Sequence, residues 1–369
     1  MFPATYEESR ARFRTYLDVV QTRWPGGRLE SHVLDDHPDL SIDWIAGDAP
    51  TPRRLFALTT ALHGIEGYVG AAMMDLFVAE FLPRLDPQDT GLLLVHAVNP
   101  WGMKHHRRGN ARHVDLNRNV LTRWEGLAEV NPEYDRALAL LHRPRPLGSW
   151  MAANLHFAGG VARLMLGMGV SGGRNAILTG QYRHPEGFYF GGTETQEEAR
   201  VLMGLQDEAL ERYGQVIHLD MHTGYGPRTQ MSIVNPTGEP GSAEEWQARL
   251  QYPRVVRTDP AEFYTIHGDM TDYWYARRET AYPGKPVYAA AFEFGTFGES
   301  LLAQVRSLRA SVLQNQLEGY GAGNRAAGER MRREYDDGYY PSDLVWREKA
   351  LADARQGFAG VLSFFGLTT

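Results

Sequence analysis

The stretch LTTALHGIEGYVGAAM (residues 58–73) joins an apolar run to a helix-like run of small residues through HGIEG (63–67). The apolar part belongs to RLFALTTAL (54–62), whose length and unbroken hydrophobicity are typical of a strand buried on both faces of a sheet. A buried strand followed at once by a helix is the repeating unit of an α/β fold. The sequence therefore places a histidine and a glutamate, three residues apart, where a buried strand ends.

The same alternation continues along the 369 residues. We expect further strands at 40–46, 90–100, 215–224 and 285–296, and helices at 5–24, 67–82, 131–142, 149–167, 193–213, 299–317 and 343–364. This order predicts an α/β fold with a mixed, twisted central sheet flanked by helices on both faces. No stretch resembles a linker, so we expect a single domain over residues 1–369, with an insertion at about 120–195, where glycines and prolines gather.

Composition excludes several classes of protein. The net charge of -7 argues against a nucleic-acid-binding protein, which should carry a basic patch. The chain has no cysteine, so disulfides are excluded and any metal ligand must be His, Asp or Glu. Residues 1–24 lack the apolar centre of a signal peptide, and no stretch reaches 18 apolar residues, so we expect a cytoplasmic protein without a membrane span.

Polar side chains follow three of the predicted strands. His63 and Glu66 follow the first, His222 closes the strand at 215–224, and Glu293 stands alone in the apolar AAAFEFG (289–295). Sites in open α/β sheets gather beyond the carboxyl ends of the strands. A catalytic zinc takes three protein ligands, and two His with one Glu is a recurrent set. Asp220 would orient a ligand or serve the structure only.

The HxxE spacing alone leaves two interpretations open. The chain has 13 histidines, so one such spacing arises easily by chance. A single His of this kind is more often a structural side chain than a metal ligand, and a buried Glu293 could be paired with an arginine.

NPWGMKHHRRGNARHVDLNRNV (99–120) removes much of that ambiguity. Its Asn-Pro-x-Gly, its Arg-Arg pair and its Asp-Leu-Asn-Arg-Asn stand between HGIEG upstream and DMHTG (220–224) and FEFGT (292–296) downstream. These ordered motifs resemble the zinc carboxypeptidase superfamily. Their details look similar to a bacterial branch near the aspartoacylase and succinylglutamate desuccinylase group, which cleaves N-acyl amino acids.

The resemblance implies one Zn²⁺ held by His63, Glu66 and His222. It also implies that Glu293 acts as the general base on a water activated by the zinc. Arg108, with Arg107 as the rival, would stabilise the oxyanion.

The resemblance further implies a clamp for a substrate carboxylate. Asn117 and Arg118 would form it, with an internal salt bridge as the alternative role of the arginine. Tyr264 would contact the substrate. The expected reaction is hydrolysis of an amide next to a free carboxylate, in a small peptide by a carboxypeptidase-like peptidase or amidase. The alternative is an N-acyl-amino-acid deacylase.

Two other classes compete with this interpretation. GVSGG (169–173) matches the G-x-S-x-G elbow of serine hydrolases, which needs a strand before the serine. A helical run precedes Ser171 here, which argues against an elbow. A non-catalytic protein on the same fold would lack a ligand or the base, and neither is missing. The sequence makes no prediction about the oligomeric state.

Overall fold

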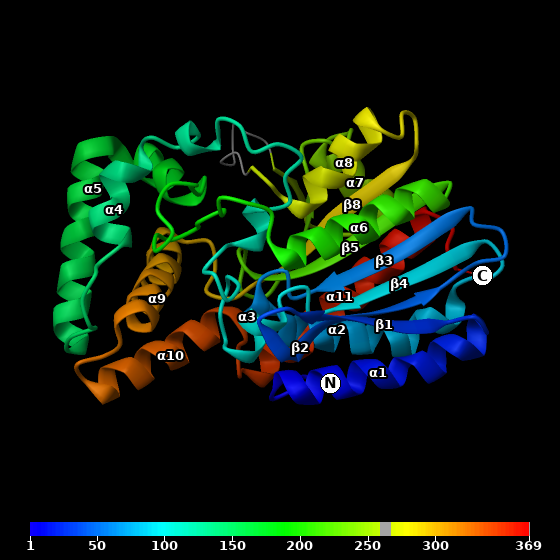
Figure 1. Cartoon of the computed structure of the whole chain (residues 1–369), viewed down its shortest axis with the longest axis horizontal. Coiled ribbons are helices and arrows are strands. Elements are labelled where there is room, and N and C mark those ends of the chain that lie inside the picture. The colour runs from blue at the N-terminus through cyan, green and yellow to red at the C-terminus, as the bar shows by residue number, and fades with distance from the viewer. Residues whose placement is uncertain (259–266, 369) are drawn as a thin grey trace.

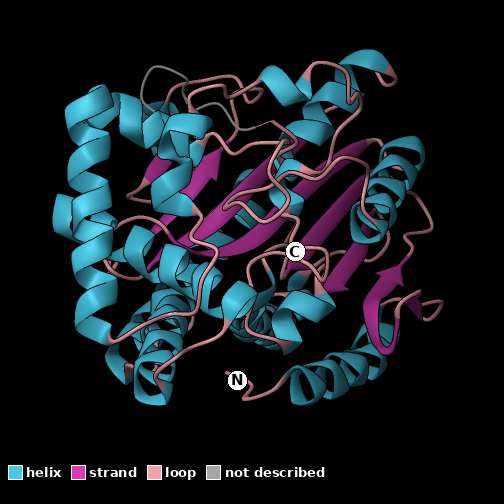
Figure 2. Cartoon of the chain, turned by 60° about the vertical axis from the view of Figure 1, so that its left-hand side comes forward, coloured by secondary structure: helices cyan, strands magenta, loops and turns pink. Residues whose placement is uncertain are grey.

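The strands form one mixed, twisted sheet. The computed structural model describes residues 1–258 and 267–368, and within them the sheet has eight strands in the order β1-β2-β4-β3-β5-β8-β6-β7 (Figure 2). The strands are β1 (Arg28–Leu34), β2 (His37–Gly47), β3 (Arg54–Thr60), β4 (Thr90–His96), β5 (Gln215–Gly224), β6 (Met231–Asn235), β7 (Val255–Arg257) and β8 (Val287–Gly295). The four central strands β4, β3, β5 and β8 are parallel to one another. The pairs β1–β2, β2–β4 and β8–β6 are antiparallel, and β7 pairs with β6 in parallel.

Helices cover both faces of the sheet, which confirms the predicted fold class (Figure 1). One hydrophobic cluster joins the sheet to α1 (Tyr6–Arg23), α2 (Gly67–Glu80), α7 (Ala243–Leu250) and α11 (Leu344–Phe364). A second cluster, on the other face, includes α3 (Pro100–Lys104), α6 (Glu197–Arg212) and α8 (Met270–Thr280). The side chains of both clusters are buried, so the central strands have apolar residues on both faces. This explains the continuous apolar runs in their sequences.

The parallel centre brings three strand ends to one edge. β5 pairs with β3 on one side and with β8 on the other, all in parallel. His222 lies directly opposite Glu293 in the β5–β8 register. The turn that follows β3 carries His63 to the same edge.

The region expected to be an insertion contains α4 (Tyr134–Leu141) and α5 (Trp150–Leu178). These two helices stand beside α9 (Leu301–Tyr320) at the left of Figure 1, with α10 (Arg325–Tyr339) below. Their apolar faces form a separate hydrophobic cluster with α9. A kink at Gly169, with φ of 69°, divides α5, and Ser171 follows it inside the helix with no strand before it. Among residues 1–258 and 267–368, no helix has the length and hydrophobicity needed to cross a bilayer.

Candidate metal centre and active site

The turn after β3 is shaped by close packing. The short helix η1 (Gly64–Glu66) lies against α3, and a Cβ on Gly64 would come within 2.1 Å of the carbonyl carbon of Gly102. Asn99 caps α3 by accepting the N–H of Gly102 at 2.8 Å. Neither Gly64 nor Gly67 has a positive φ. They are needed because no side chain would fit there.

Three buried side chains meet at this edge of the sheet. His63, Glu66 and His222 each offer a ligand atom, and these atoms lie within 4.8 Å of one another. The Nδ1 atoms of His63 and His222 are each 3.0 Å from a different carboxylate oxygen of Glu66. His63 Nδ1 is buried without a hydrogen bond, although buried polar atoms normally have one. A cation at this point would satisfy it, so these residues fit a metal ion.

The charge of Glu66 favours the binding of a cation at this site. Burial raises the pKa of the Glu66 carboxyl, but His63 and His222 outweigh burial and hold that pKa well below its usual range. Burial lowers the pKa of His222, and the charges of Asp220 and Glu66 raise it well above its usual range. The carboxylate therefore carries its charge, and its two oxygens face the two imidazoles.

An aspartate carboxylate contacts the Nε2 atom of each histidine. Asp115 Oδ1 lies 3.1 Å from His63 Nε2, and Asp220 Oδ2 lies 2.6 Å from His222 Nε2. These contacts place the Nε2 proton on the carboxylate side and leave both Nδ1 atoms for a metal. Asp220 takes the orienting position considered from the sequence. Asp115 was given no role, although the first residue of DLNRN was the signal that could have identified it.

A chain of hydrogen bonds links Asp220, the carboxylate beside His222, to side chains of other elements. Trp274 Nε1 donates to His218 Nδ1 at 3.0 Å, and an indole N–H can only donate. His218 Nε2 must then carry the proton, and it donates to Thr59 Oγ1 at 2.9 Å. Thr59 donates in turn to Asp220 Oδ1 at 2.5 Å. Burial lowers the pKa of His218 to about 4, so this imidazole stays neutral and the chain of hydrogen bonds has one direction.

Glu293 lies beside the metal ligands on β8. It lines the same cavity as they do, and Oε1 accepts the main-chain N–H of Tyr225 at 2.9 Å. Burial and the charge of Glu66 raise its pKa to about 7, against the opposing effects of His222 and the Tyr225 N–H. A carboxyl group of this pKa can accept and release a proton near neutral pH.

The two arginines of the basic pair point to different places. Arg108 Nη1 lies 3.3 Å from Glu66 Oε1, and Nε lies 3.1 Å from Asp115 Oδ2. Arg107 Nη1 instead pairs with Glu318 on α9 at 2.6 Å, and Arg107 is not among the residues that line the cavity. The main-chain carbonyls of both residues accept N–H groups of η1, which fixes the pair against the ligand turn.

Asn117 and Arg118 lie at the cavity wall with most of their groups already bonded. Asn117 donates to Asp269 at 2.8 Å and accepts the N–H of Met270 at 3.0 Å. Arg118 pairs with Asp115 and donates to the carbonyl of Leu178 at 2.8 Å, which is the internal salt bridge considered as the alternative. Its Nε is buried without a hydrogen bond.

A single family accounts for nearly all of this chain. The sequence matches the family described as "Protein of unknown function (DUF2817)" over residues 2–353. This chain belongs to the DUF2817 family. No curated protein matches it.

Solved structures similar to this DUF2817 protein include the groups named from the motifs. Carboxypeptidase A from Helicoverpa armigera is 14% identical, with a TM-score of 0.46 over 91% of this chain and 74% of that chain. Bovine thrombin-activatable fibrinolysis inhibitor, in complex with tick carboxypeptidase inhibitor, is 13% identical, with a TM-score of 0.44 over 88% and 96%. Succinylglutamate desuccinylase from Chromobacterium violaceum is 13% identical, with a TM-score of 0.37 over 82% and 72%. Such likenesses assign no activity to this chain.

Above the candidate ligands, the DUF2817 protein has a cavity of about 530 Å³. Phe188 and Tyr189, from an aromatic run at 187–192, line it, and the Tyr189 ring centre lies 4.1 Å from the guanidinium carbon of Arg118. Arg174 of α5 also lines the cavity and was not singled out from the sequence. The remaining predicted contact, Tyr264, lies outside the described residues.

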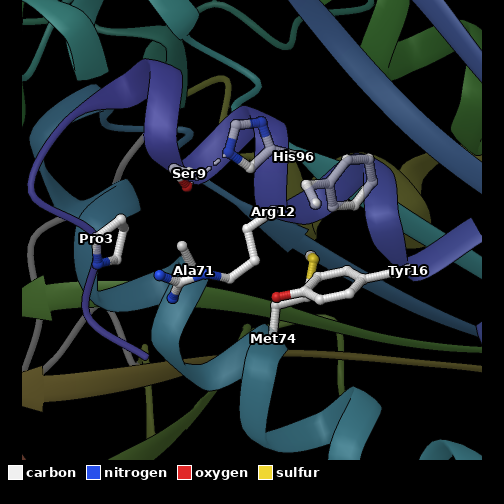
Figure 3. A pocket seen from close by; sticks show the side chains of 8 residues that line it. Pro3, Ser9, Arg12, Tyr16, Ala71, Met74 and His96 are labelled. Atoms are coloured by element: carbon white, nitrogen blue, oxygen red, sulfur yellow. Dashed lines mark hydrogen bonds between the residues drawn. The ribbon is translucent and has the colours of Figure 1, made fainter.

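Outside the candidate metal centre of this DUF2817 protein, His96 forms a hydrogen bond with a serine. Ser9 Oγ lies 2.8 Å from His96 Nε2, which is the contact of a nucleophile and its base. The dashed line in Figure 3 marks this hydrogen bond. The adjoining cavity is only about 10 Å³, room for at most one water. No substrate fits there, so this pair is structural.

Proposed function

We propose that this protein is a zinc-dependent hydrolase that cleaves an amide bond next to a free carboxylate. The observation that carries the proposal is the convergence of His63, Glu66 and His222 on one point, with Glu293 opposite His222 on the next strand. The Nδ1 atom of His63, which has no hydrogen bond to any described residue, supports the proposal of a metal at that point. Zinc would supply a Lewis acid for the substrate carbonyl and a water of lowered pKa.

The residues around that point would each have a defined task. Glu293 would take the proton of the attacking water and deliver it to the leaving nitrogen, so that the amide and water become a carboxylic acid and an amine. Arg108 would stabilise the negative charge that develops on the carbonyl oxygen. Asp115 and Asp220 would hold the two imidazoles in the tautomer that binds metal.

Two reactions would use these groups in the same way. A carboxypeptidase-like peptidase cleaves the last peptide bond of a chain, and an N-acyl-amino-acid deacylase cleaves the bond between an acyl group and an amino acid. Both reactions cleave an amide beside a carboxylate, so the metal ligands and Glu293 would serve either.

Metal content and turnover test the proposal together. Purified protein should contain one zinc per chain, and the zinc-loaded protein should hydrolyse C-terminal dipeptides or N-acyl amino acids. His63→Ala should lose both zinc and activity, whereas Glu293→Gln should keep zinc and lose turnover by roughly 10²–10⁴-fold. His156→Ala is the matched control, because His156 is exposed on α5 and does not line the cavity. Full zinc content in His63→Ala, or full activity in Glu293→Gln, would refute the proposal.

A further inference from the structure

The cavity has a polar floor and an apolar wall. The floor consists of the candidate metal ligands, Glu293 and Arg108. Three helices build the wall, with Leu140 from α4, Leu164, Met165 and Ile177 from α5, and Val305 and Leu308 from α9. A volume of about 530 Å³ is that of a site for a small organic ligand.

Among the described residues that line this cavity, one cation is free to bind a ligand. Arg108 and Arg118 are paired with carboxylates. Arg174 forms no ion pair and no hydrogen bond with any residue of 1–258 or 267–368. Arg174 lines the same cavity as Glu293 and the candidate metal ligands.

The apolar wall continues to the molecular surface. Val170 and Leu301 both line the cavity, yet they are 57% and 58% exposed. A ligand that extends beyond the cavity would therefore pass over apolar side chains.

We infer that the substrates are N-acyl amino acids with long aliphatic acyl chains. The inference rests on the proposed function and specifies its substrate class. The carboxylate of the amino acid pairs with Arg174, and the acyl chain lies against α4, α5 and α9. A peptide fits this wall less well, because its main-chain N–H and C=O groups would be buried there without partners. An aliphatic chain has no such groups, and each methylene that it buries strengthens binding roughly two- to fourfold.

The test measures binding apart from turnover. Zinc-loaded Glu293→Gln protein is titrated calorimetrically with N-acetyl-, N-octanoyl- and N-dodecanoylglycine. Affinity should rise by at least about 100-fold from the acetyl to the dodecanoyl compound. Adding Val305→Trp, whose larger side chain occupies the space beside the wall, should remove most of that gain. Leu302→Trp is the matched control on the same helix, because Leu302 does not line the cavity.

A second pair of variants tests the carboxylate contact. Arg174→Ala should weaken all three acylglycines by a similar factor, on the order of tenfold. N-dodecanoylglycinamide, which lacks the carboxylate, should bind both proteins equally. Arg163→Ala is the control, since Arg163 is exposed on the same helix and lies outside the cavity.

The outcomes separate this inference from the proposed function. Affinity that does not change with acyl length in the unmodified cavity overturns the inference, even if zinc-loaded protein cleaves short substrates or dipeptides. An equal loss for the carboxylate and the amide in Arg174→Ala also overturns it. A steep chain-length dependence without any amide hydrolysis by the zinc-loaded wild type supports the inference and refutes the proposed function.

Discussion

Replacing Glu293 by Gln should stabilise the zinc-free protein, and the gain should grow with pH. Burial and the Glu66 charge raise the pKa of Glu293 from 4.5 to about 7. Because the folded-state pKa lies above the unfolded value, this carboxyl group's contribution to stability is complete at low pH. It is lost as the pH rises from about 4.5 through about 7. A glutamine cannot ionise and escapes this loss.

The size of the effect follows from the shift. A pKa raised from 4.5 to about 7 corresponds to about 3 kcal/mol of unfolding free energy. Glu293 faces a cavity that solvent reaches, so screening reduces this, and we expect a gain of about 2 kcal/mol at about pH 8.5 relative to about pH 4.5. For 369 residues with an unfolding entropy of roughly 2.1 cal/mol/K each, the gain corresponds to about 3 °C in Tm.

Thermal unfolding of chelator-treated wild type and Glu293→Gln, followed by circular dichroism across this pH range, measures the difference. Both proteins keep every other ionisable group, so the comparison isolates the replacement of Glu293. Glu299→Gln is the control, because Glu299 lines the cavity but is 40% exposed and pairs with Arg254. A difference between Glu293→Gln and wild type that stays constant with pH would refute the reasoning.

Three further predictions concern the groups around the metal ligands. Arg108→Ala should keep zinc and lower kcat by roughly 10²–10³-fold, as expected for loss of one oxyanion donor, whereas Arg107→Ala should affect kcat far less. Steady-state kinetics with metal analysis compares the two. Asp115→Asn should weaken zinc binding roughly 10–100-fold, measured by competition with a chromophoric chelator. Trp274→Phe removes the donor that fixes the His218 tautomer, so it should weaken zinc binding less than Asp115→Asn does. Unchanged zinc affinity in Trp274→Phe would mean that this hydrogen-bond chain does not reach His222.

The central strands could be predicted because burial on both faces leaves a clear pattern. β5 has the predicted bounds, and β3 and β8 differ from theirs by one or two residues. β1, β6 and β7 were not predicted. β1 is an edge strand with one buried residue, Leu34, and β7 has only three residues. Pairing with neighbours therefore defines these strands more than their composition does.

The candidate site could be predicted where function requires residue types at fixed spacing. His63, Glu66, His222 and Glu293 meet because parallel strands end at one edge, which the order of elements implies. Arg174 and the apolar wall could not be predicted in this way. They come from α5, and that helix continues through the kink at Gly169 beyond its predicted end at residue 167. The packing of that helix against α4, with Val312 of α9 in the same cluster, sets where its side chains point.

The separation of the cavity wall from the sheet has an evolutionary consequence. The wall side chains Leu140, Leu164 and Ile177 belong to a cluster whose described members all come from outside the strands, whereas the metal ligands extend from strands anchored in two other clusters. Substitutions at these wall positions can therefore change which ligand the cavity prefers while the strands continue to hold the metal ligands in place.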